Sequence, residues 1–439
     1  MAAETMDKRP PTRLYWLIFA GSTILFFALG VMLALVFERR QEGLLVPTIV
    51  VPLADNEPDS EIWGKNFPRE FNSFQMTKDV GLRTKYGGAV QFSRLDRDSN
   101  IRHLFAGYPF SVEYNQARGH FWSLEDVEKT ARIDTARGGK ASFGTCFTCK
   151  TSNLPGLMAS IGPDKFFDTP FEKMKESVKY PIGCANCHDP KTMALRLTNP
   201  AIRKSLSDSG KDPDRLPRQE MRSLVCAQCH CEYYFQASDH YLTLPWKYGT
   251  SPDNMEKYYD EIAFTDWTHK DSKTPMIKMQ HPDYEIFVTG IHAYRGLACA
   301  DCHMPYVSEG GVKYTNHHVQ SPLTDIAHTC AVCHRQSEQE IRARVEIIQD
   351  TIWEKEVRSS QIIAQAHAEV AQALASGVDE EALKGVRQLI RKAQLRWDYI
   401  AAGNSMGFHS PLNAASILSD SIDLAQEARV QLARLKKAD

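Results

Sequence analysis

The sequence predicts a mainly α-helical protein in three parts, and three observations support this prediction. An uncharged apolar run lies near the N-terminus, five Cys-x-x-Cys pairs are spread through the middle, and residues 336–439 repeat apolar side chains at helical spacing. Glycine and proline are scattered through the middle, which indicates short helices and loops around a core filled partly by something other than side chains. The expected boundaries are residues 1–45, 46–335 and 336–439.

The charge balance argues against a nucleic-acid partner. The 52 basic and 54 acidic residues give a net charge of −2, and no long block of Lys or Arg occurs in the 439 residues. A nucleic-acid-binding surface needs clustered positive charge. We therefore expect no nucleic acid among the partners.

The N-terminal run from Leu14 to Phe37 carries no charge. A membrane-spanning helix needs about 20 apolar residues, whereas a cleavable signal peptide has an apolar stretch of roughly 7–15 residues and a small-x-small cleavage site. This run is longer and ends in Val36-Phe37-Glu38-Arg39. We expect an uncleaved membrane anchor, with a signal peptide as the alternative. Basic residues flank both ends, so charge alone does not set the orientation: Lys8, Arg9 and Arg13 precede the run, and Arg39 and Arg40 follow it.

Ten of the eleven cysteines form Cys-x-x-Cys pairs, and four pairs continue into histidine, the signal for c-type haem attachment. Zinc knuckles do not need a histidine at that position, and thioredoxin-like motifs occur singly on a βαβ frame. The sequence therefore predicts a multihaem c-type cytochrome, with short helices and loops around five covalent haems. The pairs are Cys146–Cys149, Cys184–Cys187, Cys226–Cys229, Cys299–Cys302 and Cys330–Cys333, and the histidines are His188, His230, His303 and His334.

The attachment motif also indicates where the protein works. Two thioethers fix the porphyrin edge, so the residue after the second cysteine lies beneath the ring and can meet the iron. Covalent c-type haem is assembled outside the cytoplasm, so we expect the bulk of the chain on the periplasmic or another extracytoplasmic face, with residues 1–13 inside. The unpaired Cys231 is expected to be a small buried side chain.

The pair Cys146–Cys149 is followed by Lys150 instead of histidine. A neutral amine can bind iron once its proton is lost. Of the 15 histidines, eleven lie outside the four motifs, enough to give each histidine-ligated haem the second imidazole that an electron carrier takes. The lysine haem is therefore the candidate for an open sixth position. The alternative is that Lys150 only replaces a lost histidine.

One Cys-x-x-Cys-Lys motif followed by four Cys-x-x-Cys-His motifs resembles the pentahaem cytochrome c nitrite reductases, which form ammonia. The resemblance extends from about Phe67 to His409. It implies that nitrite is reduced by six electrons to ammonium at the haem of Lys150, fed by four bis-histidine haems.

The resemblance also implies roles for residues in three segments, Gly119–Arg132, Glu232–Phe235 and Lys278–His281. It implies a catalytic pocket of Arg132, Tyr233 and His281 beside Lys150. It implies a calcium ion held by the side chains of Glu232 and Gln280 and the backbone carbonyls of Tyr233 and Lys278, an all-oxygen set that suits this ion. It implies distal haem ligands as follows: His317 for the second haem, His120 for the third, His409 for the fourth and His292 for the fifth. His318 remains a rival of His317.

The C-terminal part predicts three helices. Ser337 and Glu340 form a capping box, and Ile341, Val345, Ile348 and Ile352 follow at helical spacing. Gly377 ends this helix, a second runs from about Asp379 to Asn404, and Ser410-Pro411 begins a third. Core packing is the simplest role for such helices, but the resemblance implies a homodimer interface.

Three other functions compete with nitrite reduction. The chain could be a non-catalytic electron conduit, in which all five irons are six-coordinate. It could be an oxidoreductase whose main substrate is hydroxylamine or sulfite, or an anchored assembly subunit whose haems serve a partner. For a membrane-held nitrite reductase, we expect a quinol-oxidising multihaem cytochrome as the electron donor.

Overall fold

The computed structural model describes residues 12–42, 49–137 and 139–438. Two compact units divide the chain, one comprising Met1–Val50 with Ser308–Val312 and the other Val51–Val307 with Lys313–Asp439. Lys8 and Arg9, which were expected to flank the membrane segment, lie outside the described residues, as do the side chains of Arg39 and Arg40.

The N-terminal apolar helix is confirmed. Helix α1 spans Thr12–Glu42, and its segment Thr12–Glu38 has a mean hydropathy of 2.3. By length and composition this segment could cross a membrane, and none of its most apolar stretch is buried within the protein. A helix in this position satisfies the requirements of an anchor and of a signal sequence alike.

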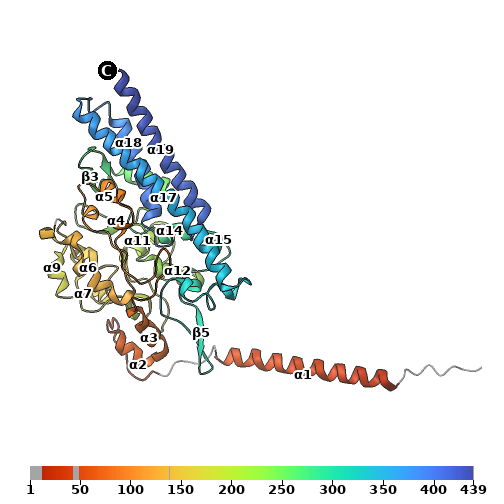
Figure 1. Ribbon diagram of the computed structural model, residues 1–439. Coiled ribbons are helices and arrows are strands. Elements are labelled where there is room, and N and C mark those ends of the chain that lie inside the picture. The colour runs from red at the N-terminus through yellow and green to blue at the C-terminus, as the bar shows by residue number, and fades with distance from the viewer. Residues whose placement is uncertain (1–11, 43–48, 138, 439) are drawn as a thin grey trace, which may run out of the picture. The chain divides into compact units, whose positions relative to one another are not determined.

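The second unit is mainly α-helical, as predicted, and its helices before residue 336 are short (Figure 1). The α-helices are α2 (Ser60–Asn66), α3 (Pro68–Gln75), α4 (Arg94–Arg97), α5 (Asn100–Leu104), α6 (Ser123–Lys129), α7 (Leu154–Ile161), α8 (Pro163–Asp168), α9 (Phe171–Lys175), α10 (Cys184–Cys187), α11 (Pro200–Asp208), α12 (Arg218–Ala227), α13 (Pro252–Glu261), α14 (Asp283–Phe287), α15 (Ile291–Tyr294) and α16 (Cys299–His303). Single 3₁₀ turns are η1 (Met76–Lys78), η2 (Pro109–Ser111), η3 (His120–Trp122), η4 (Ala131–Ile133), η5 (Thr135–Arg137), η6 (Gly144–Phe147), η7 (Pro322–Thr324) and η8 (Cys330–Val332).

The strands of the described chain form three two-stranded sheets. Antiparallel β1 (Tyr234–Phe235) and β2 (Leu242–Thr243) pair Tyr234 with Thr243, and β3 (Trp267–Thr268) and β4 (Pro275–Met276) pair Trp267 with Met276. The third sheet joins β5 (Tyr306–Glu309) to β6 (Val312–Thr315). Such small sheets cannot form a continuous core, so the helices and loops carry the fold.

Local start and stop signals explain why the helices are short. Proline occupies the first turn of α3, α7, α8, α11 and α13, where its missing N–H costs nothing. The Asn199 side chain caps α11 by accepting a hydrogen bond from the backbone N of Ala201. Gly162, at φ +76°, separates α7 from α8 in a conformation that favours glycine. The chain therefore changes direction often, which leaves the attachment motifs on short turns.

Two aromatic clusters support the attachment motifs. In the larger cluster, Phe105 contacts both Trp267 and Trp397, so the loops of the middle region pack on the C-terminal helices. In the second, Phe147 of the lysine motif stacks on Phe171 with ring centroids 4.3 Å apart. Cys231 belongs to this second cluster and is 1% exposed, as expected for a small buried side chain.

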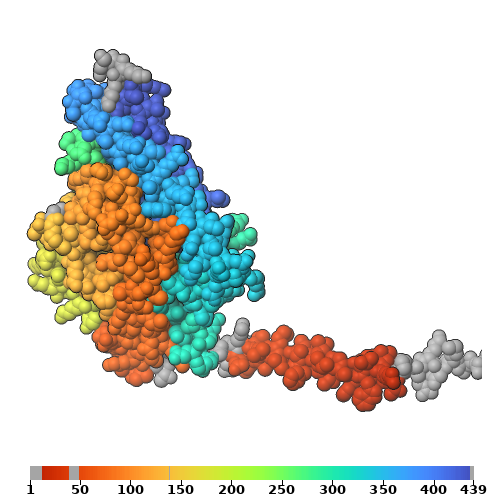
Figure 2. Space-filling model, in the orientation of Figure 1, coloured from red at the N-terminus to blue at the C-terminus, as the bar shows by residue number. Residues whose placement is uncertain are grey.

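Three long helices form the C-terminal part: α17 (Glu338–Ala375), α18 (Lys384–Ala401) and α19 (Pro411–Ala438) (Figure 1). The predicted capping box of Ser337 and Glu340 begins α17. In Figure 2 the blue surface of these helices runs along one side of the second unit. The second helix, α18, begins later than predicted, because residues 380–383 form turns and not a regular helix. It also ends before Asn404.

A buried carboxyl group of α17 makes the stability of the fold depend on pH. Glu356 is 5% exposed, and its Oε2 has no hydrogen-bond partner among the described residues. Burial raises the pKa of Glu356 from its ordinary value of 4.5 to about 7, although Arg94 and Arg97 favour the charged form. The folded protein thus holds this proton more tightly than the unfolded chain does. Stability contributed by the neutral form is present below the ordinary pKa and is lost as pH rises towards 7.

Glu356→Gln should therefore raise the melting temperature by a few degrees at pH 8 and have little effect at pH 4, because the amide carries no charge to bury. Differential scanning calorimetry at both pH values measures this. Glu354→Gln, at an exposed position of the same helix, is the matched control and should change neither value. An equal effect of Glu356→Gln at the two pH values would contradict the prediction.

Candidate functional site

The histidine attachment motifs all fold into the same type of backbone turn, and the lysine motif folds into a different type. The backbone N of His188, of His230 and of His334 donates to the carbonyl of the first cysteine of its own motif, at 3.0, 2.8 and 2.9 Å. The His303 motif forms helix α16. In the lysine motif the backbone N of Lys150 donates instead to Phe147 O at 3.0 Å, one residue closer along the chain. The lysine motif therefore differs from the others in its winding as well as in its side chain. The cysteine thiols are free, with no disulfide among the described residues.

Each motif histidine faces a second histidine from a distant part of the chain. The ring centroids lie 6.2 Å apart for His188 and His317, 6.4 Å for His230 and His120, 6.3 Å for His303 and His409, and 6.3 Å for His334 and His292. Two metal–imidazole bonds of about 2 Å each hold two ring centroids about 6 Å apart. The four gaps therefore fit an iron between two imidazoles, and the residues present suit c-type haem.

Backbone carbonyls orient several of these rings. The Nδ1 atoms of His188, His303 and His317 lie 2.9, 2.8 and 2.7 Å from the carbonyl oxygens of Met193, Gln320 and Thr315, respectively. A ring that donates Nδ1–H in this way presents Nε2 as a lone-pair ligand. The second coordination position is thus built into the fold.

The two neighbouring histidines at 317 and 318 are placed differently. His317 faces His188, whereas His318 is 5% exposed and its backbone N donates to Asn316 Oδ1 at 2.9 Å. The ring contacts of the described chain pair no motif histidine with His318. The geometry thus favours His317 as the distal residue of the second haem.

Burial favours the neutral form of three of these imidazoles. It lowers the pKa of His120 to about 3 and the pKa of His303 and of His317 to about 4, and in each case the facing histidine lowers the pKa further. Metal ligands must be deprotonated to bind. His120, His303 and His317 are therefore in the protonation state that coordination requires.

The predicted pocket residues converge on the lysine motif from three segments. Arg132 lies in η4, Tyr233 precedes β1 and His281 precedes α14. Burial lowers the pKa of Arg132, and the surrounding groups that oppose this include Tyr233 and Cys146. Burial also lowers the pKa of His281, as do the charges of His230 and Lys150. The pKa of Tyr233 is raised well above its ordinary value by burial and then by Cys149 and Cys146. All three side chains are therefore within electrostatic reach of the Cys146–Lys150 motif.

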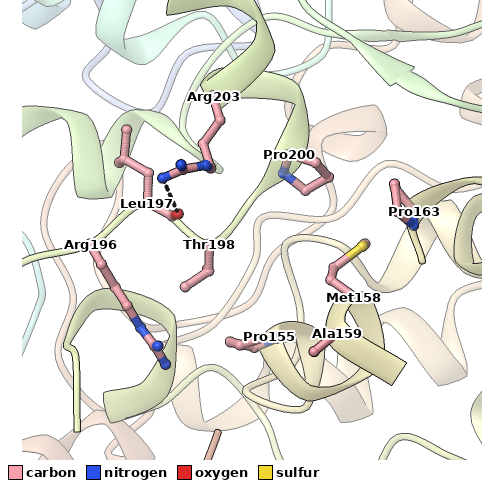
Figure 3. A pocket seen from close by; sticks show the side chains of 9 residues that line it. All are labelled: Pro155, Met158, Ala159, Pro163, Arg196, Leu197, Thr198, Pro200 and Arg203. Carbon is pink, nitrogen blue, oxygen red and sulfur yellow. Dashed lines mark hydrogen bonds between the residues drawn. The ribbon is translucent and has the colours of Figure 1, made fainter. Parts of the chain in front are cut away.

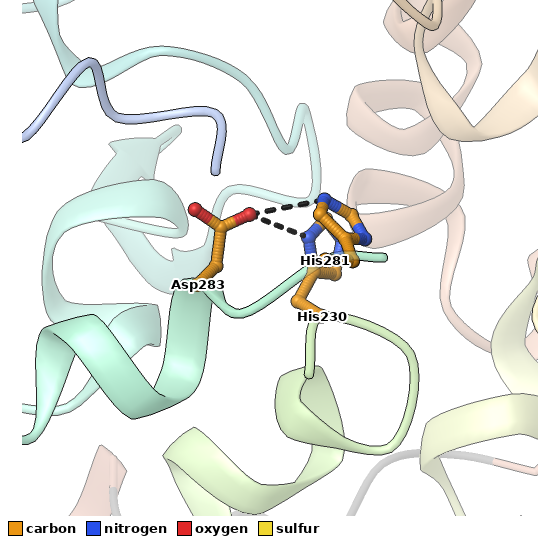
Figure 4. A group of neighbouring side chains, drawn as sticks. All are labelled: His230, His281 and Asp283. Carbon is orange, nitrogen blue, oxygen red and sulfur yellow. Dashed lines mark ion pairs between the residues drawn. The ribbon is translucent and has the colours of Figure 1, made fainter. Parts of the chain in front are cut away.

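His281 is held by two residues that the sequence did not single out, Asp283 and Asn404, and Figure 4 shows the first of them. Its Nε2 lies 3.0 Å from Asp283 Oδ2 and 2.6 Å from Asn404 Nδ2, and its Nδ1 lies 3.3 Å from Cys229 O. Although burial disfavours the charge, the neighbouring His230 and His281 rings hold the pKa of Asp283 well below its ordinary value. Asp283 stands two positions after His281 and could have been noticed there. Asn404 lies 123 positions away, so no local signal could have identified it.

The four predicted calcium residues also lie together. Glu232 is fully buried, and its carboxylate accepts hydrogen bonds from Gln280 N at 2.5 Å and from the Tyr259 hydroxyl at 3.1 Å. Gln280 Nε2 donates in turn to Lys278 O at 3.2 Å.

The charge balance of this group suits a cation. Burial raises the pKa of Glu232 well above its ordinary value. The nearby Lys278 ammonium is 2.8 Å from Asp398, which compensates it. Glu285 accepts from Glu232 N at 2.7 Å through Oε1, and its buried Oε2 has no hydrogen-bond partner in the described structure. Burial thus makes the negative charge of Glu232 unfavourable without a partner, and a bound cation would stabilise the carboxylate. Carboxylate and carbonyl oxygens are the donors that calcium prefers.

A pocket of about 420 Å³ lies next to the second attachment motif, because the backbone N of its lining residue Arg196 donates to Cys187 O at 2.9 Å (Figure 3). It is formed by α7, the first residue of α8, the segment 196–198 and α11, and Arg203 donates there to Leu197 O at 3.5 Å. None of the predicted haem, pocket or calcium residues lines it. Its lining residues are Pro155, Met158, Ala159, Pro163, Arg196, Leu197, Thr198, Pro200 and Arg203.

Comparison with known proteins finds the same relationship along nearly the whole chain. The cytochrome c552 family model matches residues 59–439. Cytochrome c-552 of Parabacteroides distasonis is 41% identical over 434 residues, which cover 98% of this chain and 88% of that protein. Cytochrome c-552 of Desulfotalea psychrophila is 38% identical, and the matched residues cover 96% of this chain and 84% of that protein. The catalytic subunit of cytochrome c nitrite reductase from Desulfovibrio desulfuricans, a structure with two calcium sites, superimposes with a TM-score of 0.82 at 34% identity and 88% coverage of each chain.

His317→Ala should leave the second haem without its distal imidazole, because His317 alone faces His188 in the described ring contacts. Ferrous haem with an open position binds carbon monoxide, so titration of the reduced protein with this gas should gain one binding equivalent per chain. His318→Ala is the matched control and should add none. A gain with His318→Ala and none with His317→Ala would reverse the assignment.

Proposed function

This chain belongs to the cytochrome c552 family, and we propose that it is a nitrite reductase that forms ammonium at a haem ligated by Lys150. The family match confirms the resemblance predicted from the order of the five motifs. The observation that carries the proposal is an asymmetry in the site. Four motif histidines each face a second histidine, whereas the lysine motif is surrounded by Arg132, Tyr233 and His281.

Conversion of nitrite to ammonium takes nitrogen from oxidation state +3 to −3, and so consumes six electrons and eight protons and releases two waters. A haem held by Cys146, Cys149 and Lys150 would supply an iron that binds nitrite and delivers the electrons. The protein must then bind the anion, stabilise charge on its oxygens and provide protons.

Arg132 is the cation for this task. Its guanidinium lies 4.4 Å from the centre of the Phe110 ring, an arrangement that stabilises a buried cation and fixes its plane. A guanidinium has several donors in a fixed fork and matches the two oxygens of nitrite. Arg132 thus attracts the anion and stabilises the negative charge that develops when an N–O bond breaks.

His281 and Tyr233 supply the hydrogen-bond and proton-donating groups. His281 is held by Asp283 and Asn404, so its ring does not have to be reoriented for each proton transfer. Tyr233 keeps its proton, because burial raises its pKa well above the ordinary value. It can therefore donate a hydrogen bond to a bound oxygen or nitrogen in a late step.

The remaining motifs are arranged to deliver electrons. The Cys149 and Cys229 thiols lie close enough to shift each other's pKa, and so do the thiols of Cys226 and Cys299. The first and third haems would therefore be attached side by side, and the third and fourth likewise. We infer a path from the fourth motif through the third to Lys150.

The same proposal includes the wider assembly. Helix α1 anchors the enzyme on the extracytoplasmic face of the membrane, and a quinol-oxidising multihaem cytochrome donates electrons. The helices of residues 336–439 form a homodimer interface. Exposed apolar side chains on α17 and α19 support this part, namely Ile347 at 56%, Leu412 at 88% and Val430 at 44% exposure.

The purified wild-type protein should reduce nitrite to ammonium with six electrons per nitrite, and Lys150→His should keep five haems but turn over at least tenfold more slowly. The substitution keeps both cysteines of the motif, so only the proximal ligand changes. Steady-state oxidation of reduced viologen, with ammonium determination, measures both. Parallel assays with hydroxylamine and sulfite rank the substrates. An unchanged rate in Lys150→His would contradict the special role of lysine. A higher catalytic efficiency with sulfite than with nitrite would show that sulfite is the main substrate.

Removal of calcium should lower kcat for nitrite by about 10- to 100-fold without loss of haem, because the ion would fix the backbone that carries Tyr233 and Gln280. Dialysis against a chelator, followed by readdition of calcium, tests this, and metal analysis should give bound calcium in the untreated enzyme. Glu232→Gln should reproduce the loss, and calcium should not restore it. Full activity of the calcium-free enzyme would show that calcium at the proposed site is not needed for catalysis.

A further inference from the structure

One buried carboxylate contacts histidines with different roles. Asp283, the first residue of α14, is 6% exposed. Its Oδ2 lies 3.0 Å from His281 Nε2 and 3.6 Å from His230 Nδ1 (Figure 4). Its Oδ1 lies 3.8 Å from His409 Nδ1. The pocket histidine, the proximal histidine of the third haem and the distal histidine of the fourth therefore surround a single negative charge.

The haem ligands differ in the group that their Nδ1 atoms face: the third and fourth haems each have a ligand beside a carboxylate, and the second has none. His188 and His317, which face each other at the second haem, both direct Nδ1 to backbone carbonyls. At the fourth haem, His303 also uses a carbonyl, but its partner His409 faces Asp283. Asp283 lies 3.6 Å from His230 and 3.8 Å from His409, beyond hydrogen-bond distance, and the buried Nδ1 of His409 has no hydrogen-bond partner among the described residues. The influence of Asp283 on these two rings is therefore electrostatic: a buried negative charge close to the ligands of an iron favours its oxidised form.

The surrounding chain fixes the Asp283 carboxylate in place. The backbone N of Asn404 donates to Oδ1 at 2.9 Å, and Asn404 Nδ2 donates to Oδ2 at 3.2 Å. Arg94 holds the Asn404 side chain through Oδ1 at 3.3 Å. The backbone N of Tyr284 donates to His230 O at 3.0 Å, which ties the start of α14 to the third motif. The carboxylate therefore cannot turn away from the three rings without breaking this network.

We propose that Asp283 is a positioning residue that lowers the reduction potentials of the third and fourth haems and holds His281 towards the substrate. The catalytic half of this assignment rests on the proposed function, whereas the effect on the potentials does not. A low potential next to the lysine haem strengthens the driving force for each electron that enters the site. The Asp283 carboxylate thereby influences both the supply of electrons to the lysine haem and the orientation of His281, the proton donor.

Asp283→Asn in the full-length holoenzyme tests the proposal, because the amide keeps the size of the side chain and removes its charge. Spectroelectrochemical titration should show two midpoint potentials shifted upward and the other three unchanged, and kcat for nitrite should fall by about 10- to 100-fold. Asp325→Asn is the matched control, since Asp325 lies 2.8 Å from Nδ1 of His328, which faces no motif histidine in the described ring contacts. It should leave potentials and turnover unchanged.

Asn404→Ala separates the two halves of the proposal. It removes the amide contacts to His281 and Asp283 but leaves the charge in place, so kcat should fall while the five potentials stay. Unchanged potentials in Asp283→Asn, or an equal shift in Asp325→Asn, would overturn the electrostatic half. Unchanged kcat in Asn404→Ala would overturn the positioning half, even where Asp283→Asn fails to assemble. If the potentials shift as expected and the wild type does not reduce nitrite, the proposed function fails and the role of Asp283 in tuning remains.

Discussion

Pairs of imidazole rings must face each other with their centroids about 6 Å apart, and the rest of this structure depends on this constraint. Four such gaps occur, and each joins a motif histidine to one that lies far away in the chain, such as His230 to His120. Imidazole rings can be held at this separation only if the backbone on both sides is fixed. Proline-started helices, carbonyl contacts to Nδ1 and aromatic clusters provide that rigidity, and no large sheet is needed among the described elements.

The lysine motif is the exception to this pairing of imidazoles. The lysine motif has a tighter turn, and its surroundings contain an arginine, a tyrosine and a histidine that is oriented by Asp283 and Asn404. A site of this kind can bind an anion and hand it protons, which a conduit for electrons does not need. Thiol contacts from Cys149 to Cys229 and from Cys226 to Cys299 connect this site to its neighbours. Binding and electron supply are thus combined in one short region.

Much of this architecture could be predicted from the sequence, because attachment motifs and helix caps are local. The mainly α fold, the apolar N-terminal helix, the capping box of Ser337 and the family are confirmed. The distal histidines came from the family resemblance, since residues such as His409 carry no local signal of their partner. The start of α18 was placed too early, because residues 380–383 form turns whose Asp379 contact to Ala382 is the same as a helix N-cap contact. Asn404 was missed because its importance arises only when segments 123 positions apart meet, whereas Asp283 stands two positions after His281 and could have been noticed.

The central claim is that one haem in five has an open coordination position and that this haem is ligated by Lys150. Magnetic circular dichroism of the oxidised wild-type holoenzyme tests it most directly, because near-infrared bands separate bis-histidine iron from other ligand sets and from high-spin iron. The account predicts four low-spin bis-histidine haems and one high-spin haem. Five low-spin haems would contradict it and would make the chain a conduit for electrons.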